Sequence, residues 1–223
     1  MRLLILCLAL TAFAASLVCA EVFWFEAENY DLDKSNPVFN EQGINVTWET
    51  KEDTNQEIRD DDISFGGMYV TSNGGNRDII AGAAGLAYIL PEVENAANWK
   101  LWIRSKMPTS GSDSFFYQFS KDGGDTWRPP DPIEAHGGAQ WTAWEWHRPW
   151  DITLAAGGGN AIRIAERESG AKFDVICLRN DGQTPTDEEY QAYLDSLEDI
   201  AVHAKGKLVD TWGRVKSHVI LDR

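Results

Sequence analysis

From Glu21 to about Asp181 the chain is a succession of short apolar segments separated by clusters of Gly, Asn, Asp and Pro. Helical periodicity is almost absent over this stretch, and turn-forming residues recur at short intervals. Short strands joined by turns are typical of a β-sandwich or a β-barrel. The sequence therefore predicts an all-β domain over residues 21–182, a two-sheet antiparallel sandwich of the jelly-roll type.

The segments expected to form strands are rich in β-branched and aromatic side chains. They are Val22–Glu28, Ile44–Thr50, Gly67–Thr71, Leu86–Leu90, Trp99–Ser105, Ser114–Ser120, Trp141–His147, Asp151–Leu154, Ala161–Ala165 and Lys172–Leu178. An apolar content of 43%, with 10 Trp, is enough to fill a core between two sheets.

Residues 1–20 have the features of a secretory signal peptide. Arg2 precedes an almost unbroken apolar run from Leu3 to Val18, and the acidic Glu21 follows at once. A membrane anchor is the alternative, but the apolar run is short for spanning a bilayer. We therefore expect a secreted protein, at an extracellular, periplasmic or cell-surface location, that is not inserted in a membrane after cleavage.

Cleavage would leave Cys177 as the one cysteine of the mature chain, so no internal disulfide can form. Its apolar surroundings predict a buried small hydrophobe rather than a nucleophile. The charge balance is strongly acidic: 20 Lys and Arg against 35 Asp and Glu give a net charge of -15. Such a balance repels phosphate backbones, which argues against nucleic acid as a partner.

Residues 183–223 differ in character and are expected to form a helical C-terminal extension. Thr186 and Glu189 have the spacing of a capping box, which predicts a helix from about Asp187 to Ala204. Its apolar residues recur at helical spacing: Tyr190, Tyr193, Leu194, Leu197, Ile200 and Ala201. This stripe either packs on the sandwich or docks elsewhere in a larger assembly.

Glu26 and Glu28 stand at positions i and i+2 of a predicted strand, so both carboxylates project from one face. Two like charges this close repel each other unless a cation lies between them, and Ca²⁺ takes such oxygen ligands. Asp174, on the last predicted strand, is the third candidate ligand, because terminal strands often pair in a sandwich. A solvated edge strand with two exposed Glu is the alternative.

Several segments together resemble the carbohydrate-binding modules of family six and related jelly-roll families. The segments are Phe25–Asn29, Gly66–Val70, Gly137–Trp144, Ile152–Gly157, Ala161–Ile164 and Phe173–Ile176. The resemblance spans most of residues 21–181. It implies a jelly roll, a structural calcium held by Glu26, Glu28 and Asp174, and sugar recognition without catalysis.

Trp141 is the first candidate for sugar binding, because it follows the Gly-Gly turn where the family carries a stacking Trp. An exposed aromatic plate buries the C–H face of a sugar ring; packing of Trp141 in the core is the alternative. The family's second aromatic is missing, and Arg77 and Lys172 stand where they could replace the lost contacts. Two cations would suit an acidic sugar. The alternative is that the sugar site has been lost and only the scaffold remains.

Ser120–Trp127 matches the Asp-box pattern Ser-x-Asp-x-Gly-x-Thr-Trp. One copy cannot build a propeller, so the pattern predicts a tight hairpin turn in which Asp122 bonds backbone N–H groups. Catalysis lacks a constellation of residues: Glu145 has no second carboxylate to pair with, and the histidines show no ligand spacing.

The sequence thus favours a secreted, non-catalytic module that binds a polysaccharide or glycan and is stabilised by calcium. One rival interpretation is a cell-surface or matrix module that uses the same scaffold to bind protein. The other is a small glycan-active hydrolase, which would need two facing carboxylates in a cleft.

Overall fold

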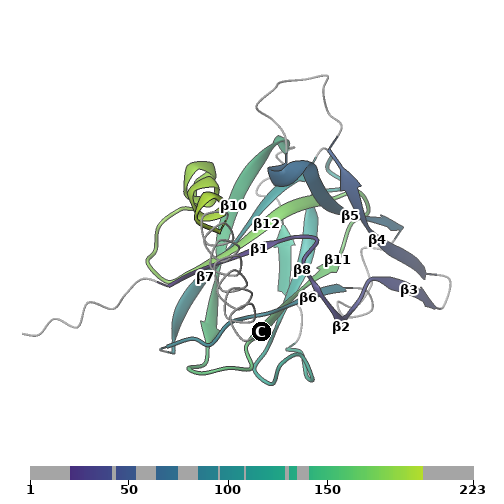
Figure 1. Ribbon diagram of the computed structural model, residues 1–223. Helices are drawn as coiled ribbons and strands as arrows, with labels where there is room; N and C mark the ends of the chain where they lie inside the picture. The colour runs from purple at the N-terminus through teal and green to yellow at the C-terminus, as the bar shows by residue number, and fades with distance from the viewer. Residues whose placement is uncertain are drawn as a thin grey trace, which may run out of the picture.

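The computed structural model describes residues 21–41, 44–53, 64–74, 85–94, 96–107, 109–128, 131–134 and 141–197. Over these residues two antiparallel sheets pack face to face, and a helix over residues 187–197 follows the last strand (Figure 1). The predicted all-β jelly-roll sandwich is therefore confirmed. The predicted signal peptide, residues 1–20, lies outside the described part of the chain.

The strands are named in chain order, and a short 3-10 turn, η1 (Phe65–Gly67), precedes the fifth. They are β1 (Val22–Glu26), β2 (Asp31–Asn36), β3 (Val38–Glu41), β4 (Ile44–Glu52), β5 (Met68–Gly74), β6 (Gly85–Ile89), β7 (Ala97–Met107), β8 (Ser114–Ser120), β9 (Asp131–Glu134), β10 (Trp141–Leu154), β11 (Ala161–Glu166) and β12 (Lys172–Arg179).

The larger sheet has the strand order β10-β7-β12-β5-β4-β3, and the smaller has the order β2-β6-β11-β8-β9. The centre of the larger sheet is β12. One edge of β12 pairs with β7, while the other edge pairs with β5 at its start and with β1 over the rest of its length. The first and last strands of the domain are therefore neighbours, as the sequence interpretation assumed.

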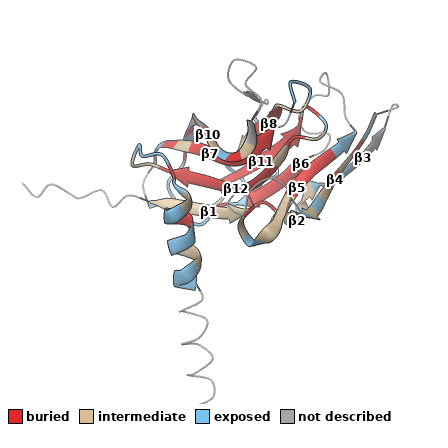
Figure 2. Ribbon diagram, turned by 90° about the horizontal axis from the view of Figure 1, so that it is seen from above, coloured by how far each residue is buried: buried red, intermediate tan, exposed pale blue. Residues whose placement is uncertain are grey.

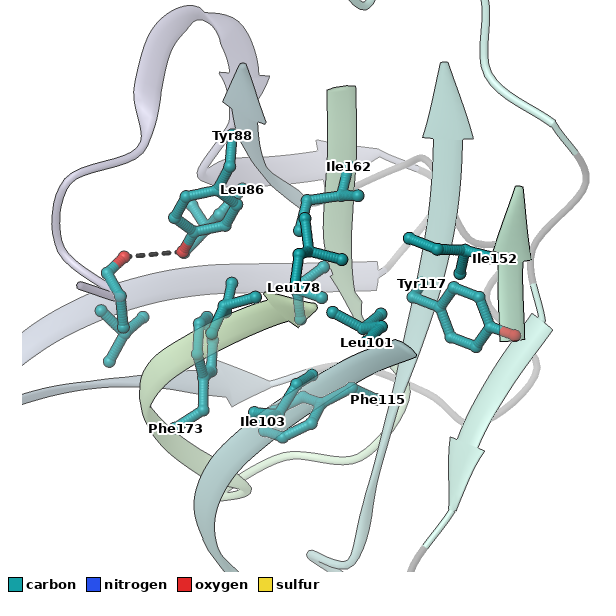
Figure 3. Close-up of a cluster of buried hydrophobic side chains, with 14 of the residues drawn as sticks. Leu86, Tyr88, Leu101, Ile103, Phe115, Tyr117, Ile152, Ile162, Phe173 and Leu178 are labelled. Carbon is teal, nitrogen blue, oxygen red and sulfur yellow. Dashed lines mark hydrogen bonds between the residues drawn. The ribbon is translucent and has the colours of Figure 1, made fainter. Parts of the chain in front are cut away.

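The core lies between the sheets and follows the alternation of each strand (Figure 3). On β7, for example, Leu101 and Ile103 are buried in the core, whereas Arg104 lies on the other face. The hydroxyl of Tyr88 donates a 2.7 Å hydrogen bond to the carbonyl of Ala27, so this buried phenol is satisfied. Each fully buried large apolar side chain contributes about 1.5–3 kcal/mol.

Three strands were not predicted, and two predicted segments form one strand. The unpredicted strands β2, β3 and β9 are short and largely polar, so they lack the alternation that marks a strand. Trp141–His147 and Asp151–Leu154 are the two ends of β10. Pro149 lies between them, and the register with β7 shifts between His147 and Trp150. Because the proline and the register shift interrupt the apolar alternation, the sequence predicted two strands where the structure has one.

The Asp box forms the predicted turn. Asp122 accepts hydrogen bonds from the hydroxyl of Ser120 and from the backbone N–H and hydroxyl of Thr126. These bonds hold the pKa of Asp122 well below its usual range. Gly124 adopts a positive φ of 87°, and a Cβ there would meet the ring of Trp127 at 3.1 Å. Cys177 is buried on β12, as predicted, and burial raises the pKa of its thiol.

The C-terminal helix begins where the capping box predicts. The N–H of Glu189 donates to Thr186 Oγ1 at 3.1 Å, and the N–H of Thr186 donates to Glu189 Oε2 at 3.2 Å. The first turns meet the sandwich, and the far end is exposed (Figure 2). The rest of the predicted helix, residues 198–204, lies outside the described residues. Within the described part of the chain, no helix combines the length and apolarity that spanning a membrane requires.

Candidate functional site

Two of the residues predicted to bind sugar lie at one end of the larger sheet. Trp141 is the first residue of β10 and pairs with Met107 at the end of β7. Lys172 is the first residue of β12 and pairs with Lys106 of β7. Because β10 and β12 flank β7 on its two sides, the backbones of Trp141 and Lys172 lie level with each other across it. The side chain of Trp141 lies outside the described structure.

Arg77 falls in residues 75–84, which are also outside the described part of the chain. This segment follows Gly74, the last residue of β5, and the N–H of Gly74 donates to Ser169 Oγ at 3.1 Å. Ser169 belongs to the connection between β11 and β12, just before Lys172. β5 therefore ends at the same end of the sheet as Lys172, and Arg77 is the third residue after Gly74 in the chain.

Lys172 is half-buried against an aromatic ring. Its Nζ lies 4.9 Å from the ring centroid of Tyr69, which fixes the ammonium by a cation–π contact. Cross-strand partners share a face of the sheet, so Lys106 and Lys172 project from the same face. Lys106 is 8% exposed, so the partly exposed Lys172 is the cation of this pair that an anion can reach. This end of the sheet is thus suited to a carboxylate, although the whole chain is acidic.

Trp144 extends this aromatic face toward the middle of the sheet. Its ring centroid lies 5.8 Å from that of Tyr69, and its indole N–H donates to Asp53 Oδ2 at 2.9 Å. Only 7% of Trp144 is exposed, so it supports Tyr69 and has little surface for a ligand.

Asp174, one of the three residues predicted to bind calcium, has a cationic side chain as its partner. Arg104 Nη1 donates to Asp174 Oδ2 at 2.6 Å, and the N–H of Phe65 donates to the same oxygen at 2.9 Å. Asp174 is 2% exposed, and burial raises its pKa to about 7 although Arg104 lowers it. The guanidinium supplies the positive charge that the sequence analysis assigned to calcium.

Glu26 and Glu28 lie near Asp174, but the three carboxyl groups do not form a set of metal ligands. Asn29 Nδ2 donates to Glu26 Oε2 at 2.7 Å. Burial raises the pKa of Glu28, and the negative charge of Glu26 adds to that rise. In the described part of the chain, no group of three or more His, Cys, Asp or Glu side chains is arranged to hold a metal ion. A structural calcium at Glu26, Glu28 and Asp174 therefore stays a prediction.

A close pair of carboxyl groups lies at the same end of the sandwich as Lys172. The N–H of Asp113 donates to Glu168 Oε2 at 2.8 Å. Burial raises the pKa of Asp113 to about 6, and its side-chain hydrogen bond to Glu168 contributes to the rise. Glycoside hydrolysis needs carboxyl groups separated by about 5–9.5 Å, with the sugar between them. Asp113 and Glu168 are instead hydrogen-bonded to each other, which links two loops and leaves no room for a sugar between them.

Sequence reasoning missed the residues that attach the helix to the sandwich. Arg104 also donates to Asp187, the first helical residue, and the indole N–H of Trp146 donates to Asp187 Oδ1 at 2.8 Å. Tyr190 is fully buried, with its ring 4.7 Å from that of Phe65 and 5.2 Å from that of Trp24. The start of the apolar stripe therefore packs on the sandwich. The capping box located the helix start, but no local signal pointed to Arg104.

A scan of the sequence against protein-family models found no match, and a search of curated proteins found no similar sequence. Solved structures are similar at low identity. The C-terminal CBM6 of LamC, a marine laminarinase from Zobellia galactanivorans, has a TM-score of 0.44 and 15% identity, covering 71% of this chain and 98% of that chain. A family 35 carbohydrate binding module from Clostridium thermocellum has a TM-score of 0.41 and 15% identity, covering 71% and 97%.

A third similar structure is the carbohydrate binding module CBM6cm-2 from Cellvibrio mixtus lichenase 5A, which was solved in complex with cellotriose. It has a TM-score of 0.40 and 15% identity, covering 74% of this chain and 97% of that chain. Modules of family six, which the sequence resembles, are thus among the structures found. Similarity at this level does not assign a ligand to this chain.

Proposed function

We propose that this chain is a secreted, non-catalytic carbohydrate-binding module that binds an acidic polysaccharide at the Lys172 end of the larger sheet. The observation that carries the proposal is the cross-strand pair of Lys106 and Lys172, with the ammonium of Lys172 over the ring of Tyr69. A hexuronate carboxylate would bind the ammonium of Lys172, and Trp141 would supply the apolar plate for the C–H face of the ring.

Calcium is not part of this proposal, because Asp174 already pairs with Arg104. The uronate is held by protein cations and aromatic rings alone. Binding should therefore weaken as the salt concentration rises, since charge attraction at a partly exposed site is screened.

The test compares polygalacturonate with its methyl ester, which has the same backbone without the charge. We expect the wild-type chain to migrate more slowly in native gels that contain polygalacturonate than in gels without it. In gels that contain the methyl ester its migration should be unchanged. Lys172→Met keeps the apolar stem but removes the charge, and Trp141→Ala removes the plate; each should weaken binding at least tenfold.

Lys100→Met is the matched control. Lys100 also lies on β7 and pairs with Asp151, about 20 Å along the strand from Lys106 at the usual rise per residue. The Lys100→Met variant should bind polygalacturonate as the wild type does. Equal binding of polygalacturonate by wild type and Lys172→Met would reject this site, and no binding to any glycan of a panel would favour the protein-binding interpretation.

A further inference from the structure

A pocket of about 160 Å³ lies between β1 and the C-terminal helix. One wall comes from the sandwich, with Trp24 and Glu26 of β1 and the nearby Asn29. The other wall comes from the helix, chiefly Tyr193 and Leu197. The pocket therefore exists only because the helix packs beside the first strand.

One end of this pocket is polar and negatively charged. Glu26 Oε2 accepts a hydrogen bond from Asn29 Nδ2 at 2.7 Å, and Glu26 Oε1 accepts one from the hydroxyl of Tyr190 at 3.4 Å. Both donors are neutral, so they orient the carboxylate without neutralising it. Each carboxylate oxygen has a second lone pair for a further donor.

The field around this end is negative as well. The N–H of Ala27, between Glu26 and Glu28, donates to the carbonyl of Asp174 at 2.7 Å, so three acidic residues meet here. Arg104 already pairs with Asp174 and Asp187. A cationic donor that reaches Glu26 would thus be favoured, whereas a uronate would be repelled.

The remaining wall is aromatic and aliphatic. The rings of Trp24 and Tyr193 lie 6.4 Å apart with 31° between their planes, and Tyr193 is half-buried. Leu197 is 44% exposed, although it lines the pocket. A ligand with a flat apolar face would cover these side chains and gain the free energy of burying them.

These observations together call for a small ring with one apolar face and a positively charged donor at its edge. We propose that the pocket binds a hexosamine ring, a protonated 2-amino-2-deoxyhexose of the kind repeated in chitosan. Its ammonium would bind Glu26, its hydroxyls would reach Asn29, and its C–H face would cover Tyr193. The choice of a sugar rests on the proposed function, while the choice of an amine rests on Glu26.

Three oligosaccharides of one backbone test the proposal: the tetramers of β-1,4-linked glucosamine, N-acetylglucosamine and glucose. They carry an ammonium, a neutral amide and a hydroxyl at the same ring position. Titration calorimetry at pH 5.5 should give a Kd for the glucosamine tetramer at least tenfold lower than for the other two, which corresponds to about 1.4 kcal/mol. Equal affinity for the amine and the amide would overturn the proposal.

Glu26→Gln keeps the shape of the pocket and removes its charge. It should raise the Kd of the glucosamine tetramer at least tenfold and leave the glucose tetramer unchanged. Tyr193→Ala should weaken binding of all three. Glu52→Gln, an exposed position on β4 in the same sheet, is the matched control and should match the wild type. An unchanged Kd in Glu26→Gln would also reject the site.

Polygalacturonate separates this proposal from the function proposed above. Glu26→Gln should still bind polygalacturonate, which also reports that it is folded, and Lys172→Met should still bind the glucosamine tetramer. If the wild-type chain binds the glucosamine tetramer but not polygalacturonate, the first site is contradicted. If it binds polygalacturonate but not the glucosamine tetramer, the second site is contradicted. If tetralysine displaces the glucosamine tetramer at similar concentration, the pocket recognises amines on peptides and the hexosamine assignment fails.

Discussion

The guanidinium of Arg104 donates two hydrogen bonds to the carboxylate of Asp187, from Nε at 3.0 Å and from Nη2 at 2.9 Å. Its third nitrogen, Nη1, donates to Asp174, and its planar group lies 4.5 Å from the ring centroid of Phe65. One side chain on β7 thereby links β12, the turn before β5 and the first residue of the C-terminal helix.

Arg104→Met should destabilise the fold by about 3–5 kcal/mol, because it leaves the carboxylate of Asp174 buried without a cation. Asp187→Asn should cost only about 1 kcal/mol or less, because Asp187 is 45% exposed and solvent screens its attraction to Arg104. Urea unfolding at pH 7 measures both free energies.

The double variant Arg104→Met with Asp174→Leu is the control for this pair. It removes both charges, so it should recover most of the stability that the single Arg104 variant loses. A single variant within about 1 kcal/mol of the wild type would show that Arg104 does not carry the charge balance of this site.

Chelation should leave the melting temperature unchanged. The physical reason is that Asp174 has Arg104 as its cation, so no divalent ion is needed to offset its charge. Differential scanning calorimetry with EDTA, then with added Ca²⁺ or Mg²⁺, measures this. A lower Tm in EDTA that Ca²⁺ restores and Mg²⁺ does not would establish the calcium site predicted from Glu26, Glu28 and Asp174.

Glu166→Gln should make the protein less sensitive to alkaline pH. Glu166 is 2% exposed at the end of β11, and burial raises its pKa to about 8, a shift that the nearby Ser72 hydroxyl only partly opposes. In the described structure neither carboxylate oxygen has a partner at hydrogen-bond geometry. The folded state therefore holds a proton that the unfolded state releases near its ordinary value of 4.5.

A raised folded pKa stabilises the protein fully below the unfolded value, and this stabilisation is lost as the pH rises through the folded value. Between those two values the wild type should lose about 1.4 kcal/mol per pH unit from this group, while the Gln variant loses none. Urea unfolding at pH 5 and pH 8 should show the variant gaining relative to the wild type. The exposed Glu145→Gln is the control, and a constant difference for Glu166→Gln would refute the assignment.

Thr186→Ala should loosen the start of the C-terminal helix by about 1 kcal/mol, because the N–H of Glu189 loses its acceptor. Hydrogen exchange of the amides of residues 188–190 measures the change locally. Thr186→Ser keeps the hydroxyl and should protect these amides as the wild type does. Equal exchange in the Ala variant would mean that tertiary contacts alone hold the helix start.

The features predicted correctly are those that neighbouring residues encode. Alternation of apolar residues predicted β8 (Ser114–Ser120), and the Thr186–Glu189 spacing predicted the helix start, because both patterns act over a few residues. The polar β2 and β9 could not be predicted, since they are strands only through pairing with β6 and β8.

The candidate sites divide in the same way. Lys172 was identified from its place in the chain, but the ring beneath it, Tyr69, belongs to a different strand. Arg104 gave no signal, because a polar residue at an alternate position of a strand is the normal pattern of an outer face. Its partners Asp174 and Asp187 are 70 and 83 residues away.

The sequence by itself determined the class of fold, the turns and the start of the helix, because side-chain periodicity and backbone preferences are local properties. The tertiary structure decided which charges meet: it paired Arg104 with Asp174, set Lys106 beside Lys172, and placed the helix against Trp24. These pairings depend on strand order and register, which are set by how the whole core packs.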